Sequence, residues 1–247
     1  MPKADLHIHT RSSDGLATVE QVLEYVQHST DLDVIAITDH EDARPALRAR
    51  DLAASRGYRF EVVPAAEVTT INGHLLALFI ESTPGSFRRV ESTLEEIHRQ
   101  GGLAVVPHPM SWATRSVSRR TLDRLSARAE PGLTFDAIEL ANASPAGTLT
   151  RAKAERLNET TWRLPPVGSS DAHHLPCVGT GWTEFPGTGA AGLRRAIEER
   201  TTVGRMSRYP SLREIGLHRV ALQLAWGYAA TPRKILGGSR RHREPTP

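Results

Sequence analysis

The sequence predicts a mostly parallel α/β barrel of about seven strands, and three observations favour that fold class. Short apolar, β-branched runs alternate with helix-like segments through the first 170 residues, which is typical of βα units around a parallel sheet. Nearly every run ends in a His, Asp or Glu, and barrel enzymes collect their chemistry at the carboxyl ends of the strands. The 247 residues, 39% hydrophobic and 24% charged, can fill one such core.

The predicted strands are apolar almost throughout, as strands buried on both faces should be. They cover residues 4–9, 34–38, 60–65, 74–80, 103–107, 137–141 and 164–168. Helices are predicted between them over 18–29, 43–56, 86–99, 118–129 and 148–160, with a further one from Leu193 to Arg200. Thr18 followed by Gln21 matches a capping box, which supports the start of the first helix.

Charge divides the chain into a barrel, residues 1–204, and a tail, residues 205–247. The tail carries nine Lys and Arg against Glu214 and Glu244, a net +7, so the barrel carries −4 of the total of +3. The sequence pI of about 9.3 is therefore weak evidence that the barrel binds nucleic acid.

The tail begins with a helical pattern from Ser211 to Ala230, supported by a capping box of Ser211 and Glu214. Its apolar face is formed by Leu217, Ala221, Leu224 and Tyr228. We expect this helix to pack on the barrel. Two alternatives are an amphipathic helix on an anionic membrane, which is not favoured, and a basic arm that attracts nucleic acid.

Cysteine usage and hydropathy predict a cytoplasmic protein. Cys177 is the one cysteine, which excludes an intramolecular disulfide and fits a reducing compartment. The N-terminus has no apolar signal-peptide core, and no run of 18 apolar residues could span a membrane. We expect Cys177 to be a small buried apolar residue.

Candidate metal ligands stand at the ends of the predicted strands. His7 and His9 are two apart on the first strand, so their side chains point to the same face. Each other candidate alone could be a helix cap or a satisfied structural histidine. Together, nine imidazoles and carboxylates aimed at one edge would carry a heavy desolvation cost unless cations neutralised them. The nine are His7, His9, Asp14, His40, Glu67, His74, His108, Asp171 and His173.

This donor set, which contains no thiolate, favours two or three Zn²⁺, Mn²⁺ or Fe²⁺ ions. The motifs D-L-H-I-H-T, S-S-D-G, I-T-D-H, A-A-E-V-T, V-P-H-P and S-S-D-A-H, in that order and with His74 between the fourth and fifth, resemble the PHP (polymerase and histidinol phosphatase) family. The resemblance covers residues 3 to about 200. It implies a distorted (β/α)7 barrel with up to three divalent metals at its carboxyl-end rim.

The resemblance also implies how the ligands divide among the metals. His7, His9, Glu67 and Asp171 would hold the first metal, and Glu67 would bridge to a second, which His74 and His108 also hold. Asp14, His40 and His173 would hold a third. Asp171, His173 and His40 are the candidate catalytic groups. Asp39 is predicted to orient a neighbour or cap a helix, and His174 is a less favoured proton donor.

Clustered metals generate a hydroxide near neutral pH and clamp the charge of a phosphoryl displacement, so we expect a metal-dependent phosphoesterase. Asp14 in S-D-G resembles the family members that hydrolyse nucleotides and short oligonucleotide ends. Only 33 residues separate His74 from His108, too few for the cap that many of those members insert there. Candidate substrate-binding residues are Arg11, Arg44, Arg115 and Asn142, the last paired with Glu139 in A-I-E-L-A-N.

The expected partner is a small phosphorylated substrate, most simply a nucleotide. One alternative is an exonuclease that trims RNA or DNA ends, with the basic tail as an electrostatic guide. Another is a non-catalytic metal-binding scaffold. Loss of ligands would signal such a scaffold, and every ligand position is filled here.

Overall fold

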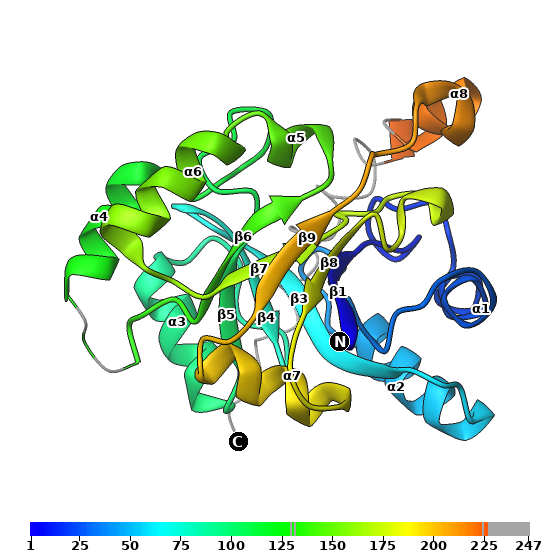
Figure 1. Ribbon diagram of the computed structural model, residues 1–247, viewed down its shortest axis with the longest axis horizontal. Coiled ribbons are helices and arrows are strands. Elements are labelled where there is room, and N and C mark those ends of the chain that lie inside the picture. Colours follow the sequence, from blue (N-terminus) through cyan, green and yellow to red (C-terminus); the bar gives the residue numbers. More distant parts are fainter. Residues whose placement is uncertain (129, 131, 224, 227–247) are drawn as a thin grey trace, which may run out of the picture.

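The computed structural model describes residues 1–128, 130, 132–223 and 225–226 (Figure 1). Its strands are β1 (Lys3–Ile8), β2 (Val34–Ile37), β3 (Glu61–Thr70), β4 (Gly73–Leu78), β5 (Leu103–Val106), β6 (Ala137–Asn142), β7 (Pro166–Ser169), β8 (Gly181–Glu184) and β9 (Val203–Met206). Its α-helices are α1 (Val19–Ser29), α2 (Arg44–Arg56), α3 (Val90–Arg99), α4 (Arg119–Arg128), α5 (Pro145–Thr148), α6 (Arg151–Leu157), α7 (Gly189–Glu198) and α8 (Leu212–Ile215). A π-helical turn, η1 (Asn158–Trp162), and a 3₁₀ turn, η2 (Leu175–Cys177), complete the list.

The nine strands form one sheet in the order β7-β6-β5-β4-β3-β2-β1-β8-β9. The sheet curls until its β7 end closes on β1 and β8, because the chain just after β7 bonds to β1. His9 N donates to Ala172 O at 2.9 Å, and Ala172 N donates to His7 O at 3.2 Å. Thr183 of β8 also bonds to Gly168 of β7 through its hydroxyl. The predicted barrel is therefore confirmed, although its closure is irregular.

Strand direction departs from the expected parallel barrel. β4 is antiparallel to both β3 and β5, and β8 is antiparallel to β1. A two-residue turn before Gly73 joins β3 to β4, and Gly73 has φ +130°. A Cβ there would also lie 2.4 Å from Val117 N, so only glycine fits. Because β4 runs backwards, His74 at its start reaches the rim where the parallel strands end.

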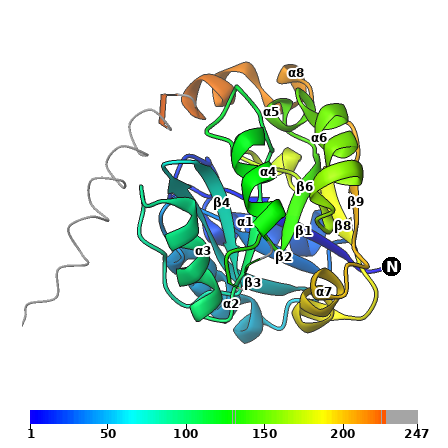
Figure 2. The same cartoon turned by 90° about the vertical axis from the view of Figure 1, so that its left-hand side faces the viewer.

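Three apolar clusters separate the barrel interior from two outer layers. The interior cluster takes residues from β1 to β7 and is closed at one end by Leu193, Ala196 and Ile197 of α7. One outer layer packs α1 and α2 on β1–β3, and the other packs α3, α4 and α6 on β3–β6. Figures 1 and 2 both place α7 at the end of the molecule opposite α5 and α8.

A register shift in β1 turns both site histidines inward. Ala4 pairs with Val34 and Asp5 with Ile35, but the register shifts between Asp5 and Ile8. Leu6 belongs to the interior cluster, whereas Ile8 packs with the outer layer of α1 and α2. Strand irregularities of this kind re-aim side chains next to functional sites. Here His7 joins His9 on the inner face.

Several helix predictions need correction. The helix expected over 86–99 begins at Val90, and the one expected over 148–160 is split into α5, α6 and η1. The helix expected from Leu193 begins at Gly189 and ends at Glu198. β8 and β9 were not predicted, because their sequences, G-W-T-E and V-G-R-M, are not continuous apolar runs. The capping box of Thr18 and Gln21 is confirmed.

The predicted boundary after residue 204 falls inside β9, which pairs with β8. In the tail, the capping box of Ser211 and Glu214 is confirmed, but α8 ends at Gly216, where φ is +93°. Residues 217–223 are helical again, and predicted face residues Leu224 and Tyr228 lie outside the described residues. Ile215 is 4% exposed and packs with Val220 into the apolar layer beside α1, so the tail contacts the barrel. The predicted apolar face is wrong, because Leu217 is 66% exposed and Ala221 is exposed as well.

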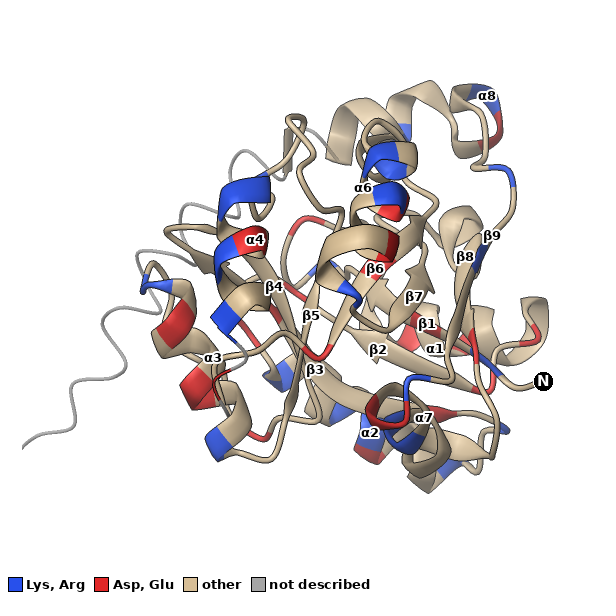
Figure 3. Cartoon of the chain, turned by 60° about the vertical axis from the view of Figure 1, so that its left-hand side comes forward, with Lys and Arg blue, Asp and Glu red and all other residues tan. Residues whose placement is uncertain are grey.

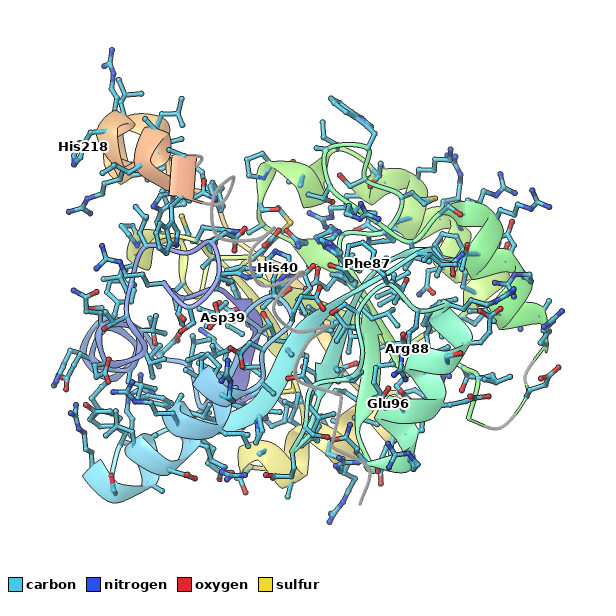
Figure 4. All side chains as sticks on the ribbon, turned by 180° about the vertical axis from the view of Figure 1, so that it is seen from behind. Asp39, His40, Phe87, Arg88, Glu96 and His218 are labelled. Carbon is cyan, nitrogen blue, oxygen red and sulfur yellow. The ribbon has the colours of Figure 1, made fainter. Side chains whose placement is uncertain are left out.

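Among the residues that the structure describes, no helix combines the length and apolar composition needed to cross a bilayer. Acidic and basic side chains are interspersed over the outer helices (Figure 3). Several form surface ion pairs, for example Arg88 with Glu96 of α3 at 3.0 Å (Figure 4). Such exposed pairs contribute little to stability.

Candidate metal centre

The inner face of the barrel changes from aliphatic to polar along each strand. Ala65 is followed two residues later by Glu67 on β3, and Leu76 on β4 is preceded by His74. Ala137 is followed by Glu139 on β6. On β7, every second residue after Val167 faces inward, and this series reaches Asp171 just after the strand. Alternate residues of a strand share a face, so the fold stacks a polar layer on an aliphatic one. The polar layer is the candidate metal centre.

All nine predicted ligands meet in this layer. Their ligand atoms form overlapping groups within 4.8 Å of one another: His7 with His108 and Asp171, His7 with His9 and Glu67, His9 with Asp171 and His173, His9 with Asp14 and His40, and His40 with Glu67 and His74. Seven are under 10% exposed, and Asp14 and His173 are half-buried. The convergence follows from the sheet closure, which brings the ends of β1 and β7 together.

Glu67 stands at the middle of the cluster with its two oxygens facing different histidines. Oε1 lies 2.7 Å from His74 Nδ1 and 3.4 Å from His108 Nε2. Oε2 lies 3.3 Å from Nε2 of both His7 and His9, and 3.4 Å from His40 Nδ1. A carboxylate in this position can bridge two cations, each shared with a different pair of imidazoles.

The remaining carboxylates complete two further sets. Asp171 Oδ1 lies 3.5 Å from Nε2 of both His7 and His9. Asp14 Oδ2 lies 3.1 Å from His173 Nε2 and 3.6 Å from His40 Nε2. These contacts agree only in part with the grouping that the resemblance implies. His9 also groups with Asp14, His40 and His173, and His108 groups with His7 and Asp171. His40 faces Glu67 as well as Asp14, so the division of ligands among the metals stays a prediction.

A hydrogen-bonded shell orients the ligands from behind. His7 Nδ1 lies 3.0 Å from Glu139 Oε1, so a proton on Nδ1 leaves Nε2 free to face the cluster. Glu139 Oε2 accepts from His108 N at 2.9 Å and from Asn142 Nδ2 at 2.8 Å. Ser144 Oγ donates to Asp171 Oδ2 at 3.0 Å. His7, His108 and Asp171 are thus positioned by other polar groups.

The loops that carry Asp14 and His108 are held in the same way. Asp39 accepts from Thr10 N at 2.8 Å, and it also accepts from the hydroxyls of Thr10 and Ser13. His108 Nδ1 lies 2.8 Å from Ser116 Oγ. The contacts of Asp39 agree with its predicted orienting role.

Two ligands have strained backbones. Asp171 has φ +53° and His108 has φ +29°, in a region that residues other than glycine rarely adopt. Such strain persists only where the surrounding structure holds it, and here Ser144 and Glu139 supply that support.

Buried atoms that lack hydrogen-bond partners indicate that the cluster is suited to bind cations. Several buried side-chain atoms face one another at short distance but not in hydrogen-bond geometry, and so make no hydrogen bond: His9 Nδ1, Asp14 Oδ1, His40 Nδ1, Glu67 Oε1 and His74 Nδ1. Buried polar atoms are nearly always paired, so atoms that converge without hydrogen bonds indicate a missing ligand. Imidazole and carboxylate donors without thiolates suit divalent transition metals.

Electrostatics in the cluster indicate strong coupling between acids and imidazoles. Burial alone would raise the pKa of Glu67, but His74, His40 and His7 hold that pKa well below its usual range. Burial alone would lower the pKa of His40, but the carboxylates of Glu67 and Asp14 raise it to about 10. In the same way Asp14 raises the pKa of His173 to about 9 against the effect of burial.

The predicted substrate-binding residues lie in different surroundings. Arg11 is exposed on the loop that leads to Asp14. Arg44 forms a bidentate pair with Asp42, with contacts of 2.8 and 2.7 Å. Arg115 lies over the Phe87 ring, 5.4 Å from its centre.

Asn142 is 2% exposed, and its amide and carbonyl groups bond to Glu139 and Ser144 N. It positions Glu139, and its substrate contact stays a prediction, as do those of the three arginines.

Two residues beside the cluster have apolar surroundings. Cys177 is fully buried, as predicted, and burial raises the pKa of its thiol to about 11. His174 is 7% exposed, and burial lowers the pKa of its ring to about 4, with smaller effects from His173 and Arg219. Its role as a proton donor stays a prediction.

Sequence reasoning missed the supporting hydroxyls of Ser144, Thr114 and Ser116. Ser144 follows A-I-E-L-A-N and begins a short helix, so its position as a cap was the available signal. Nothing in the spacing of Thr114 and Ser116 pointed to His108, because the loop conformation decides that contact.

Comparison with known proteins identifies relatives of the chain. The model of a family described as PHP-associated matches residues 151–202. An uncharacterized protein of Methanocaldococcus jannaschii is 32% identical over 152 residues, which is 57% of this chain and 82% of that protein. The 5′-3′ exoribonuclease Rnm of Salmonella typhimurium is 27% identical over 158 residues, or 62% of this chain and 46% of the enzyme. This chain thus spans less than half of that enzyme.

Among solved structures, the fold resembles that of a two-domain protein of Bacteroides vulgatus, described as containing a predicted PHP-like metal-dependent phosphoesterase. The TM-score is 0.65 at 21% identity, covering 83% of this chain and 64% of the other. The nine converging ligands, the barrel and the relatives agree with one another. The chain belongs to the PHP family.

Proposed function

We propose that the protein is a metal-dependent hydrolase that removes the phosphate from a small phosphomonoester, most simply a nucleotide. The observation that carries the proposal is the position of Glu67. One of its oxygens faces His74 and His108, and the other faces His7, His9 and His40. Two cations on either side of one carboxylate are the arrangement that phosphoryl transfer uses.

Two to three divalent metals such as Zn²⁺, Mn²⁺ or Fe²⁺ would supply a water of lowered pKa and positive charge against the phosphoryl oxygens. The chain's own residues hold and orient the reacting groups. Asp171 is held ionised, because burial raises its pKa less than His7 and His9 lower it, and its Oδ1 can accept a proton from a water. Where no third metal is held, His40 and His173 stay protonated beside Asp14 and can donate a proton to the departing oxygen, and where one is held they act as its ligands instead.

A candidate substrate-binding residue lies at the entrance of the site. Arg11 is the predicted arginine on the loop of Asp14, and it is exposed. An arginine can hold a non-reacting phosphate oxygen through a bidentate contact. Arg44 is less suited to bind substrate, because its guanidinium already donates two hydrogen bonds to Asp42.

A second candidate function is exonucleolytic trimming of RNA or DNA. It is favoured by the 27% identity to an exoribonuclease, although the chain spans 46% of that enzyme. The basic tail, with Arg233, Lys234, Arg240, Arg241 and Arg243, could then add phosphate contacts. Those five residues lie outside the described part of the structure.

The test is hydrolysis of a phosphomonoester, a phosphodiester and a 5′-phosphorylated oligonucleotide, together with elemental analysis. We expect two to three equivalents of transition metal per chain and fastest turnover of the phosphomonoester. Glu67→Ala should abolish it, whereas Glu155→Gln, a change in an exposed ion pair with Arg151, should not. Preference for the oligonucleotide would favour the exonuclease. Full metal content without hydrolysis of any substrate would leave only the scaffold interpretation.

A further inference from the structure

A cavity of about 260 Å³ lies beside the metal centre and takes no part in the proposed reaction. It is lined by Leu16, Ala17, Gln21, His174, Leu175 and Arg219. His174 has an extended backbone, with φ −137° and ψ 143°. Successive side chains of an extended chain point to opposite sides, so His173 faces Asp14 in the metal centre while His174 faces this cavity.

The lining contains polar groups that lack partners. His174 is 7% exposed, and its Nδ1 has no hydrogen-bond partner in the described part of the chain. A buried ring nitrogen without a partner is costly, which indicates a ligand at this position. Arg219 forms no ion pair with any described residue, and Gln21 uses only its oxygen, on Thr18 N at 2.9 Å, so its amide protons remain free. These groups converge from three segments of the chain.

The electrostatics of the cavity favour an anion. Arg219 supplies a full positive charge, and helix α1, which begins at Val19, directs the positive end of its dipole toward the Ala17 wall. Glu20, the acidic residue in the first turn of α1, forms an ion pair with Arg48. Leu16 and Leu175 add apolar walls suited to the organic part of a ligand.

The tail completes this site. Ile215 and Val220 pack against the layer that contains Ala17, Cys177 and Val178, which fixes the helix bearing Arg219 over the cavity. The neighbouring His218 points away from the barrel in Figure 4. We propose that this cavity is a second, phosphate-binding site, in which Arg219 and His174 hold the anion and Gln21 donates to it.

The experiment measures binding of inorganic phosphate to the metal-loaded protein by equilibrium dialysis. The variant is Arg219→Gln, and the matched control is Arg213→Gln, an exposed arginine of α8 that does not line the cavity. Wild type and the control should bind one equivalent of phosphate more than Arg219→Gln, or bind that equivalent at least about tenfold more tightly. Melting temperatures should be equal for all three.

A second readout locates the anion. The His174 ring resonance, assigned by its loss in His174→Gln, should shift on phosphate addition in wild type and not in Arg219→Gln. Equal phosphate binding by the three proteins, or an unmoved His174 resonance, would overturn the proposal. Neither readout requires turnover, so failure of the proposed hydrolase would be seen separately.

Kinetics then distinguish the source of the anion. If the phosphate belongs to the substrate, Arg219→Gln should raise KM for a nucleoside bisphosphate more than for the matching nucleoside monophosphate. If it is a free ligand, the two KM values should change equally while phosphate binding is still lost.

Discussion

Replacing Glu139 by glutamine tests whether this buried carboxylate positions the metal ligands. Glu139 Oε1 faces His7 Nδ1 at 3.0 Å and accepts from the Ser169 hydroxyl. Its Oε2 accepts from His108 N at 2.9 Å and from Asn142 Nδ2 at 2.8 Å. All four partners are donors, and glutamine keeps the shape but offers one oxygen and one amide group.

The magnitude follows from counting those donors. The new amide group must face either His7 Nδ1 and the Ser169 hydroxyl or His108 N and Asn142 Nδ2. Ser169 and Asn142 can turn to accept a proton, but the backbone N–H of His108 cannot. If the amide faces His108, that buried N–H stays unpaired, which costs about 1–3 kcal/mol. If the amide faces His7, the ring must move its proton to Nε2, the atom that faces the cluster. We therefore expect about 10- to 100-fold weaker metal binding.

Competition with a chelator of known affinity measures metal binding, and thermal melting of the metal-free protein measures stability. Glu155→Gln is the control, because Glu155 pairs only with exposed Arg151 in the described structure. If Glu139→Gln binds metal as tightly as wild type while melting earlier, Glu139 supports the barrel alone, and its assignment as a positioning residue is wrong.

Four further predictions concern the ligands, the protons, the barrel closure and the tail. Glu67→Ala should remove two metals per chain, whereas His174→Ala should leave metal content intact, and elemental analysis giving the reverse order would contradict the ligand assignment. Because His40 and His173 have pKa values of about 10 and 9 in the metal-free protein, both are protonated at pH 7, so metal uptake should release protons and strengthen as pH rises. Calorimetry in buffers of different ionisation enthalpy detects this release, and uptake without it would refute the coupling. The same raised pKa values stabilise the metal-free protein below the ordinary value of 6.5, so its melting temperature should fall as pH rises toward 10. Gly181→Ala would place a Cβ 2.0 Å from Ser169 O, where β7 and β8 meet. The free energy of unfolding measured in urea should therefore fall by more than about 2 kcal/mol. An unchanged urea midpoint would mean that the barrel closes differently. Deleting residues 231–247 should leave phosphomonoester hydrolysis unchanged and, if the tail guides nucleic acid, flatten the salt dependence of oligonucleotide hydrolysis; equal loss of both activities would assign the tail a structural role.

The amino-acid sequence alone was enough to predict the alternation of strands and helices and the nine candidate ligands that the structure brings together. Both are local properties. Apolar runs and capping residues such as Thr18 act over a few positions, and ligand residue types can be read where each run ends. The separation of two residues between His7 and His9 was enough to predict a shared face.

Tertiary structure decided how those ligands meet. The reversed direction of β4 brings His74 to the rim, and the register shift in β1 turns the shared face of His7 and His9 inward. Neither feature has a local signal, because strand pairing is chosen by long-range burial. Closure of β1 on Ala172 then places Asp171 next to His7 and His9. The tail required tertiary contacts as well, since Gly216 interrupts its helix and the packing of Ile215 and Val220 places Arg219 at the cavity beside His174.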